Sequence, residues 1–328
     1  MTKIPWTQRT LDVTGGCTKC AAGCKNCWAI REVWRQNRHP KWQGLVEKTA
    51  AGLNWTGKIK LFPEMLEVPL RTRKPTIFFV NSKSDLFHPK VPFDYIDKFH
   101  AIAALCPQHK LQVLTKRIER AAEYYGKEYL PTRVENVSKQ MQIIKRNPYF
   151  YLQDYCVNDK VGLVLPNLWL GTSISTQADL DKVWQTMRDI SAAIKFYSYE
   201  PILELISFKI DEWQSYLEPC SYYCEHNEFG GGHRPERGID WVIIGCESGP
   251  KRRLCSLDDI RDAIQQCQYA NVPVFVKQIP IEGKCNKKPE EWPEWARVQE
   301  YPEINETGLA TEGTEINEDK DNGYTGTV

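Results

Sequence analysis

The chain has 328 residues, of which 41% are hydrophobic, and a formal net charge of +1. This composition excludes a disordered chain, and no apolar run approaches the roughly twenty residues that a membrane span requires. The N-terminus has no apolar signal segment, so we expect a cytoplasmic protein without a membrane partner. Twelve cysteines in a reducing compartment favour metal ligands or redox groups over a disulfide framework.

The charge is unevenly distributed along the chain. Residues 301–328 have seven acidic residues and one lysine, a local charge of −6, so residues 1–300 have a charge of +7. We expect residues 301–328 to form a disordered acidic tail, because almost no large apolar residue follows Leu309. A mildly basic body is compatible with a nucleotide or nucleic-acid partner.

A first strand is expected near residues 10–14, and it leads into four cysteines within eleven residues: Cys17, Cys20, Cys24 and Cys27. Cys20, Cys24 and Cys27 have the C-x3-C-x2-C spacing by which radical S-adenosylmethionine (SAM) enzymes hold a 4Fe–4S cluster on three thiolates. A tetrahedral zinc site is the alternative. Structural zinc sites usually draw two ligand pairs from separate loops about a dozen residues apart, so the spacing favours the cluster.

The rest of the chain alternates between short apolar runs and segments with helical periodicity. The expected strands are residues 76–80, 111–115, 168–172, 195–199, 241–245 and 273–277, and the expected helices are residues 93–106, 117–125, 177–190 and 257–270. This alternation predicts an α/β fold of βαβ units, either a full or partial TIM-like barrel or an open doubly wound sheet. No G-x-G-x-x-G or Walker A loop follows a strand, which counts against the open sheet.

In barrels of this kind the functional residues lie at the C-terminal ends of the strands. Polar residues follow six of the predicted strands: Asn81, Ser82, Ser84, Asp85, Lys116, Arg117, Ser173, Ser175, Glu200, Glu247, Ser248, Lys277 and Gln278. Their succession predicts one active face. For each residue the alternative is a helix cap or a hydrogen bond within its loop.

Three further features are candidates for chemistry. His88 could be a general acid or base, or it could hold its loop by a hydrogen bond. Cys246 could donate a hydrogen atom in a radical reaction, or it could be a small buried side chain. Residues 31–41 are basic with an interleaved tryptophan, and they form either a phosphate-contacting surface or a solvated helix face.

Residues 219–237 interrupt the alternation between the fifth and sixth expected strands. They contain Cys220, Cys224, His226 and His233, which are acceptable zinc ligand types at a non-standard spacing. The segment is therefore either a second metal site or an insertion that faces the substrate or is purely structural.

The stretch around the cysteines also resembles the N-terminus of a phage-enriched three-cysteine family of unknown function, whose pattern is W-T/N…TGC…GC-x-x-C-Y/W-A. Further segments match in the same order: residues 73–92, 111–117, 168–175, 196–203, 239–250 and 272–278. The recurring cysteines of that family correspond to Cys17, Cys24 and Cys27, so Cys17 competes with Cys20 as the third ligand. That family is similar to radical SAM enzymes, and distantly to spore photoproduct lyase.

The resemblance implies a radical SAM enzyme on a partial (β/α) TIM-like barrel over residues 1–300, with an insertion at about 211–238 and a cap at about 280–300. It implies a 4Fe–4S cluster and SAM as cofactors, and an electron donor such as flavodoxin or ferredoxin. A nucleobase, a nucleotide or an intermediate of phage DNA modification is the expected substrate, in the host cytoplasm if a phage encodes the protein. The alternative is a non-catalytic zinc- or cluster-binding module that interacts with nucleic acid.

The resemblance also suggests roles for the strand-end residues. For the amino group of SAM the candidates are Asn81, Ser82, Ser84 and Asp85. Its carboxylate is expected on Lys116 or Arg117, and its ribose hydroxyls on Ser173, Ser175 and Glu200. Glu200, Glu247, His88 and Cys246 are the candidate catalytic residues. Radical SAM enzymes usually have an aromatic residue just before the last cysteine, whereas this chain has Asn26 there and Trp28 after the cysteine.

Overall fold

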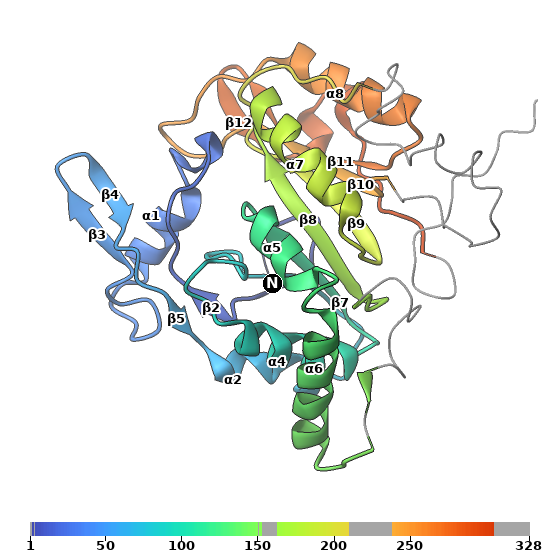
Figure 1. Ribbon diagram of the computed structural model, residues 1–328. Coiled ribbons are helices and arrows are strands. Elements are labelled where there is room, and N and C mark those ends of the chain that lie inside the picture. Colours follow the sequence, from blue (N-terminus) through green and yellow to red (C-terminus); the bar gives the residue numbers. More distant parts are fainter. Residues whose placement is uncertain (1, 3, 150, 153–162, 210–237, 305–328) are drawn as a thin grey trace, which may run out of the picture.

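The computed structural model describes residues 2, 4–149, 151–152, 163–209 and 238–304. Their main sheet has eight strands in the order β1-β6-β7-β8-β9-β10-β11-β12 (Figure 1). All neighbours are parallel except β11 and β12, which form an antiparallel pair. The strands are β1 (Arg9–Leu11), β6 (Ile77–Val80), β7 (Lys110–Thr115), β8 (Leu168–Ile174), β9 (Ile194–Tyr199), β10 (Trp241–Gly245), β11 (Val274–Ile281) and β12 (Lys284–Asn286). The sheet is curled into a half-barrel, and its edge strands β1 and β12 do not pair with each other.

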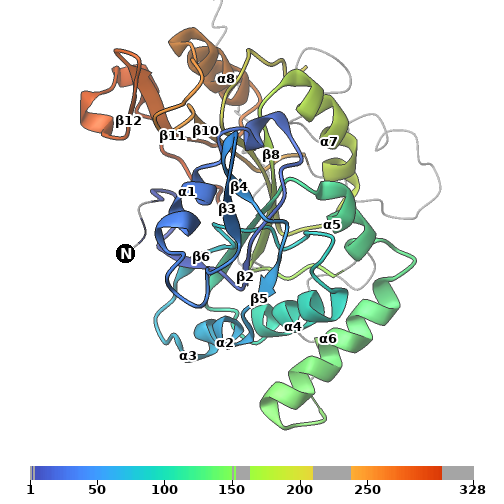
Figure 2. The ribbon, with the colours of Figure 1, turned by 90° about the vertical axis from the view of Figure 1, so that its left-hand side faces the viewer.

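Helices between successive parallel strands lie on the outer side of the curled sheet (Figures 1 and 2). They are α4 (Phe93–Ala104), α5 (Ile118–Tyr125), α7 (Gln177–Asp189) and α8 (Leu257–Tyr269), and α6 (Leu130–Lys145) packs against α4. Parallel neighbours need such crossovers because a tight turn cannot connect them.

The connection from β1 to β6 is longer and contains the cysteines. It includes the small sheet of β2 (Thr14–Gly15) with β5 (Lys60–Leu61), the helix α1 (Trp28–Arg35), the hairpin of β3 (Val46–Thr49) and β4 (Gly52–Trp55), and the short helices α2 (Pro63–Leu66) and α3 (Val68–Arg71). In Figure 2 this blue segment lies on the side of the sheet that faces the viewer.

Side chains alternate between the two faces of each strand, and the two faces belong to different cores. Val242 and Ile244 of β10, for example, belong to the core between sheet and helices, whereas Trp241 and Ile243 point into the curl. The inward set is mainly aromatic and fills the N-terminal end of the curl. We call it the aromatic base, and it consists of Trp6, Phe79, Trp169, Ile194, Phe196, Trp241, Ile243 and Phe275.

The predicted parallel α/β fold is confirmed, and its sequential strand order rules out the doubly wound sheet. The described residues form a half-barrel and not a complete barrel. Each predicted strand and helix in the main sheet layer is found close to its predicted bounds, whereas the pattern analysis did not identify α6 or β12. In the expected cap, Trp292 is buried and Gln299 pairs with Phe275.

Two predictions fall on residues outside the described part of the chain. They are the second Cys/His set (Cys220, Cys224, His226 and His233) with its insertion, and the acidic tail beyond residue 304. Within the described part, the Tyr301 ring stacks on Trp241 at a centroid distance of 5.4 Å. None of the described helices is both long and apolar enough to cross a bilayer.

Candidate functional site

A cavity of about 630 Å³ opens at the C-terminal ends of the parallel strands, above the aromatic base. Its wall contains all four clustered cysteines and inward-facing residues from the strand ends: Asn81, Lys116, Ser173, Ser198, Glu200 and Lys277. The inward positions are therefore aromatic at one end of the curl and polar at the other. We call the polar end the mouth.

The cysteine loop, residues 16–27, lies between β2 and α1 and is held by several strand ends. Arg117, after β7, donates to the Thr18 carbonyl at 2.8 Å. Gly23 packs so closely against Ser175, after β8, that a Cβ there would lie 2.5 Å from the serine Oγ. Only glycine allows this approach of the loop to the sheet.

The loop after β10 holds the other side of the cysteine loop. Asn26 donates to Glu247 Oε2 at 3.0 Å and to the Lys251 carbonyl at 2.7 Å. Arg253 pairs with Glu247 at 2.5 Å and donates to the Ala22 carbonyl at 2.9 Å. Asn26, which stands where radical SAM enzymes usually have an aromatic residue, is thus an anchor of the loop. Glu247 is a candidate catalytic residue that the structure places in this anchor.

The four thiols differ in their surroundings. Cys17 is half-buried with Sγ 3.7 Å from Arg117 Nη1, and burial raises its pKa to about 12. Burial also raises the pKa of Cys27. Cys20 is exposed at the rim, and its thiol donates to Cys24, which lowers the pKa of Cys24; nearby Lys116 lowers it further.

Clustered cysteine sulfurs beside the cations Lys116 and Arg117 are the soft donor set that an iron–sulfur cluster or zinc requires. The four thiols do not converge on one point: Cys17 contacts Arg117 and the Thr18 carbonyl, whereas Cys20 contacts Cys24. In the described ranges, no group of three or more His, Cys, Asp and Glu side chains is arranged to hold a metal ion.

The residues after β6 mainly bind other parts of the protein. Asp85 accepts from Thr115 Oγ1 and Arg117 Nη1, both at 2.8 Å. Ser82 donates to Asp12 at 3.0 Å, and Ser84 donates to the Thr14 carbonyl at 2.8 Å. These candidates for the SAM amino group therefore hold β6 against the segment that leads into the cysteines.

Asn81 is the exception in this group. Its Oδ1 accepts from the backbone N–H groups of Val13 and Thr14 at 2.9 and 3.0 Å, and its φ is 58°. These two contacts fix the orientation of the amide. Its buried Nδ2 has no hydrogen-bond partner among the described residues, and the residue lines the cavity. A buried donor of this kind carries a free-energy cost unless a ligand accepts from it.

Lys116 and Arg117 differ in what remains available to a ligand. The Arg117 guanidinium binds Asp85 and Thr18. Among the described residues, Lys116 makes no side-chain hydrogen bond or ion pair, and it lines the cavity beside Cys24. Lys116 is thus the better candidate of the two for a carboxylate.

Glu200 lies across the cavity from the strand β6. Both of its carboxylate oxygens accept from Lys277, at 2.5 and 2.7 Å, and Gln278 donates to it at 3.1 Å. Ser173 lines the same cavity, whereas the backbone N–H of Ser175 donates to Asp179 at 3.0 Å. Glu200 and Ser173 therefore reach the cavity, and Ser175 supports the loop.

His88 follows β6 and Cys246 follows β10, and neither is among the described residues that line the cavity. His88 Nε2 lies 3.1 Å from Thr18 Oγ1, and burial together with Arg117 lowers its pKa to about 4. Cys246 is buried after β10, and its thiol donates to Cys285 of β12, which lowers the pKa of Cys285. His88 is thus a neutral contact of the cysteine loop near pH 7.

A family model described as "Protein of unknown function (DUF5131)" matches residues 1–318. The chain belongs to the DUF5131 family. No curated protein and no solved structure shows significant similarity to it. Membership of DUF5131 therefore supplies no activity, and the function must be argued from the site.

In this DUF5131 protein, three residues of the mouth and its surroundings were not predicted from the sequence: Ser198, Arg253 and Cys285. Ser198 could have been found from strand alternation, because it follows Ile194 and Phe196 on the inward face of β9 and lines the cavity. Arg253 and Cys285 had no such pattern. Their positions depend on how the loops after β10 and β11 fold back over the mouth.

Proposed function

We propose that this protein is a radical SAM enzyme. The observation that carries the proposal is the position of the cysteine loop: it lies over the mouth of a parallel half-barrel, so the thiols and the strand-end polar groups face one cavity of about 630 Å³. That volume lies within the usual range of small-molecule sites. Active sites of (β/α) barrels are also built at this end of the strands.

Cys24, Cys27 and Cys17 are the residues that would hold a 4Fe–4S cluster. Cys17 is the better third ligand, because it is half-buried inside the mouth, with its Sγ 3.7 Å from Arg117 Nη1. Cys20 is exposed at the rim. Its contact with Cys24 makes it the spare thiol. The recurring cysteines of the resembling family are the same three.

When bound, the reduced cluster and SAM would supply the chemistry: one electron cleaves the S–C5′ bond of SAM to methionine and a 5′-deoxyadenosyl radical, which abstracts hydrogen from the substrate. A flavodoxin or ferredoxin would supply the electron. The protein binds and orients. Lys116 would pair with the carboxylate of SAM, and the unpartnered Nδ2 of Asn81 would donate to an oxygen of the ligand.

Other mouth residues would orient the nucleoside part and the substrate. Ser173 and Ser198 point into the cavity from adjacent strands and are suited to ribose hydroxyls. Lys277 and Gln278 hold the Glu200 carboxylate in place, so that it can accept from a ligand hydroxyl. The aromatic base closes the other end of the curl, which excludes water from below.

The proposal is tested by anaerobic reconstitution with iron and sulfide, followed by iron analysis and by assay for 5′-deoxyadenosine after addition of SAM and dithionite. We expect about four irons per chain and SAM-dependent 5′-deoxyadenosine. Cys27→Ser should lose both. Cys106→Ala, which removes a buried cysteine outside the mouth, is the matched control and should retain both.

The competing function is a non-catalytic zinc- or cluster-binding module, which the same cysteine loop would suit. Colourless protein that binds one zinc and forms no 5′-deoxyadenosine would favour that module and contradict the enzyme. If the protein binds about four irons per chain but does not cleave SAM, the proposed cluster stands and the proposed radical chemistry is contradicted.

A further inference from the structure

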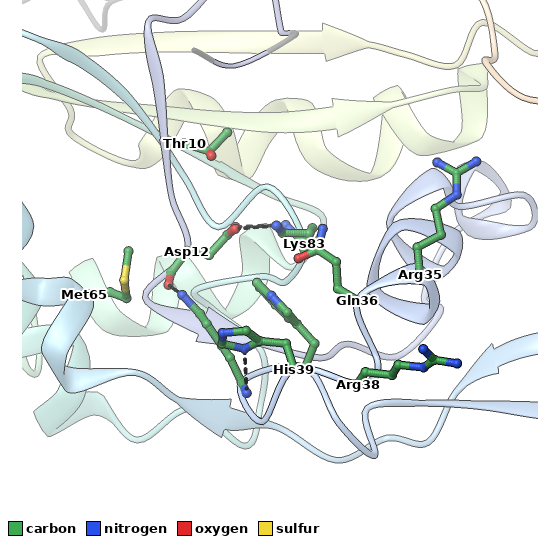
Figure 3. A pocket seen from close by; sticks show the side chains of 10 residues that line it. Thr10, Asp12, Arg35, Gln36, Arg38, His39, Met65 and Lys83 are labelled. Atoms are coloured by element: carbon green, nitrogen blue, oxygen red, sulfur yellow. Dashed lines mark hydrogen bonds and ion pairs between the residues drawn. The ribbon is translucent and has the colours of Figure 1, made fainter.

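A second cavity, of about 530 Å³, lies beside the mouth between α1, the loop after it and the loop after β6 (Figure 3). We call it the basic pocket and define it by Arg35, Arg38, Lys41, Lys83 and Trp42. Thr10, Arg35 and Lys83 line both cavities. A ligand can therefore extend from one into the other.

The basic pocket has four cationic side chains and one carboxylate, that of Asp12. Figure 3 shows Asp12 directed at Lys83, and its Oδ2 lies 3.1 Å from Lys83 Nζ. Ser82 also donates to Asp12 Oδ1, at 3.0 Å. Because Asp12 is already paired, it offsets one of the four charges, and the pocket remains positive.

Aromatic rings hold the two lysines of the basic pocket in place. Lys83 Nζ lies 4.3 Å from the centroid of Trp42, and Lys41 Nζ lies 4.4 Å from that of Phe62. Lys41 also donates to the Asp12 carbonyl at 3.4 Å, and burial lowers its pKa. The two ammonium groups are thus ordered before a ligand arrives, which reduces the entropy lost on binding.

The two arginines of the basic pocket are exposed and accessible to an anion. Arg35 pairs with Glu32 one helical turn away at 3.3 Å, with the arginine side chain 68% exposed. An exposed pair of this kind contributes little. In the described part of the chain, Arg38 makes no ion pair or side-chain hydrogen bond. Guanidinium groups bind phosphate in a bidentate geometry and are the common choice for it.

We infer that the basic pocket binds a phosphate group of the substrate, which is a nucleotide or a nucleic-acid strand whose reacting unit enters the mouth. The entry of that unit rests on the proposed function, whereas the phosphate contact does not. Trp28, 42% exposed at the edge of the mouth, lies where a base could stack.

The test is fluorescence anisotropy of a fluorescein-labelled single-stranded oligodeoxynucleotide, measured on the full chain over a series of salt concentrations. The variant Arg35→Ala/Arg38→Ala removes two exposed cations of the pocket. Lys127→Ala/Lys139→Ala removes the same charge from exposed positions at and before α6. Both variants change exposed side chains, so we expect both to fold.

We expect the pocket variant to bind about tenfold more weakly, and its slope of log K against log salt to fall by about one to two. The control variant should match the wild type. Equal affinity and equal slope for the pocket variant and the control would overturn the inference.

Competition by a deoxynucleoside monophosphate and by the corresponding nucleoside separates the two sources of phosphate. If the monophosphate displaces the probe and the nucleoside does not, and if the pocket substitutions weaken this displacement, the pocket binds a terminal phosphate. No displacement by either, with the loss of oligonucleotide affinity, assigns it to a backbone phosphodiester. SAM cleavage is measured separately, on wild-type protein without substrate. A negative result for SAM cleavage therefore leaves the conclusion on phosphate binding unchanged, and a negative result for phosphate binding leaves the conclusion on SAM cleavage unchanged.

Discussion

The mouth and the aromatic base of the curled sheet are built from the same strands and the same inward positions, yet they have opposite chemistry. On β9, Phe196 belongs to the base and Ser198, two residues on, lines the cavity. On β11, Phe275 and Lys277 have the same relation. The difference teaches that stability and function are separated along each strand rather than between strands.

The largest effect is expected at the base. Trp241→Ala removes a fully buried ring that packs against Trp6 and Trp169 and whose Nε1 donates to the Glu300 carbonyl. We expect a loss of about 3–5 kcal/mol in the free energy of unfolding, measured by urea denaturation. Trp34→Ala, at a position 37% exposed, is the control and should change it by less than about 1 kcal/mol. Equal losses in both variants would show that the base is not the stabilising region.

Within the mouth, substitution should abolish function with little effect on folding. Cys17→Ser should lose nearly all bound iron after anaerobic reconstitution, whereas Cys20→Ser should keep it, because Cys17 lies inside the mouth and Cys20 at the rim. Iron analysis of the two variants decides between the thiols. The opposite pattern would make Cys20 the third ligand, and loss in neither would reject a cluster at this loop.

As the pH falls, we expect the cysteine loop to detach from the mouth at a higher pH than that at which the aromatic base unfolds. The pKa of His88 is lowered to about 4 in the folded protein, against about 6.5 in an unfolded chain. Between these values the opened loop binds one more proton than the closed loop, so closure weakens as the pH falls, by at most about tenfold per pH unit. Hydrogen exchange of residues 17–27 should therefore rise relative to that of β8, after correction for the intrinsic rate.

The variant His88→Gln supplies the control for this pH dependence. Glutamine retains hydrogen-bonding groups and does not titrate in this range, so the extra opening of the loop between pH 6.5 and 4 should disappear. Unchanged pH dependence in His88→Gln would assign the effect to another group.

The smallest effect is expected at Ser198. Ser198→Ala should leave the free energy of unfolding within about 0.5 kcal/mol of the wild type, since the hydroxyl faces the cavity. Loss of one hydrogen bond to a ribose hydroxyl should weaken SAM binding about fivefold, as measured by calorimetry on reconstituted protein. Ser191→Ala, in the connection between α7 and β9, should change neither quantity. Unchanged SAM affinity in Ser198→Ala would remove this residue from the proposed site.

Much of the fold was predictable, because buried parallel strands are continuous apolar runs and the helices between them are amphipathic. The runs at 111–115 and 241–245 became β7 and β10 almost without change. The helix α6 was missed, since its polar sequence gives a weak periodic pattern. The half-barrel could not be distinguished from a full barrel, because closure depends on whether edge strands meet in space.

The cysteine loop and the strand-end residues of the site were predicted from the sequence. Which of these residues bind other parts of the protein, and which remain accessible to a ligand, was not predicted. Asp85 and Glu247 were predicted at the mouth and lie there, yet Arg117 and Arg253 bind their carboxylates. Conversely, in the described part of the chain the buried Nδ2 of Asn81 has no hydrogen-bond partner and the Lys116 side chain makes no ion pair. Whether a polar side chain can still bind a ligand depends on which other side chains contact it in the fold. Arg117, which binds Asp85, is 32 residues away from it in the chain, and Arg253 reaches Glu247 only because the loop after β10 folds back.

The sequence by itself determined the parallel strands and the helices between them, though not α6 or β12. It also placed four thiols between a first strand and a first helix, because strand propensity and ligand spacing are local properties. Tertiary structure alone decided that Arg117, Gly23 and Asn26 clamp those thiols over the mouth. It also decided that the basic residues after α1 form a pocket continuous with the mouth. These arrangements arise only when the curled sheet brings its strand ends to one side, which no local pattern encodes.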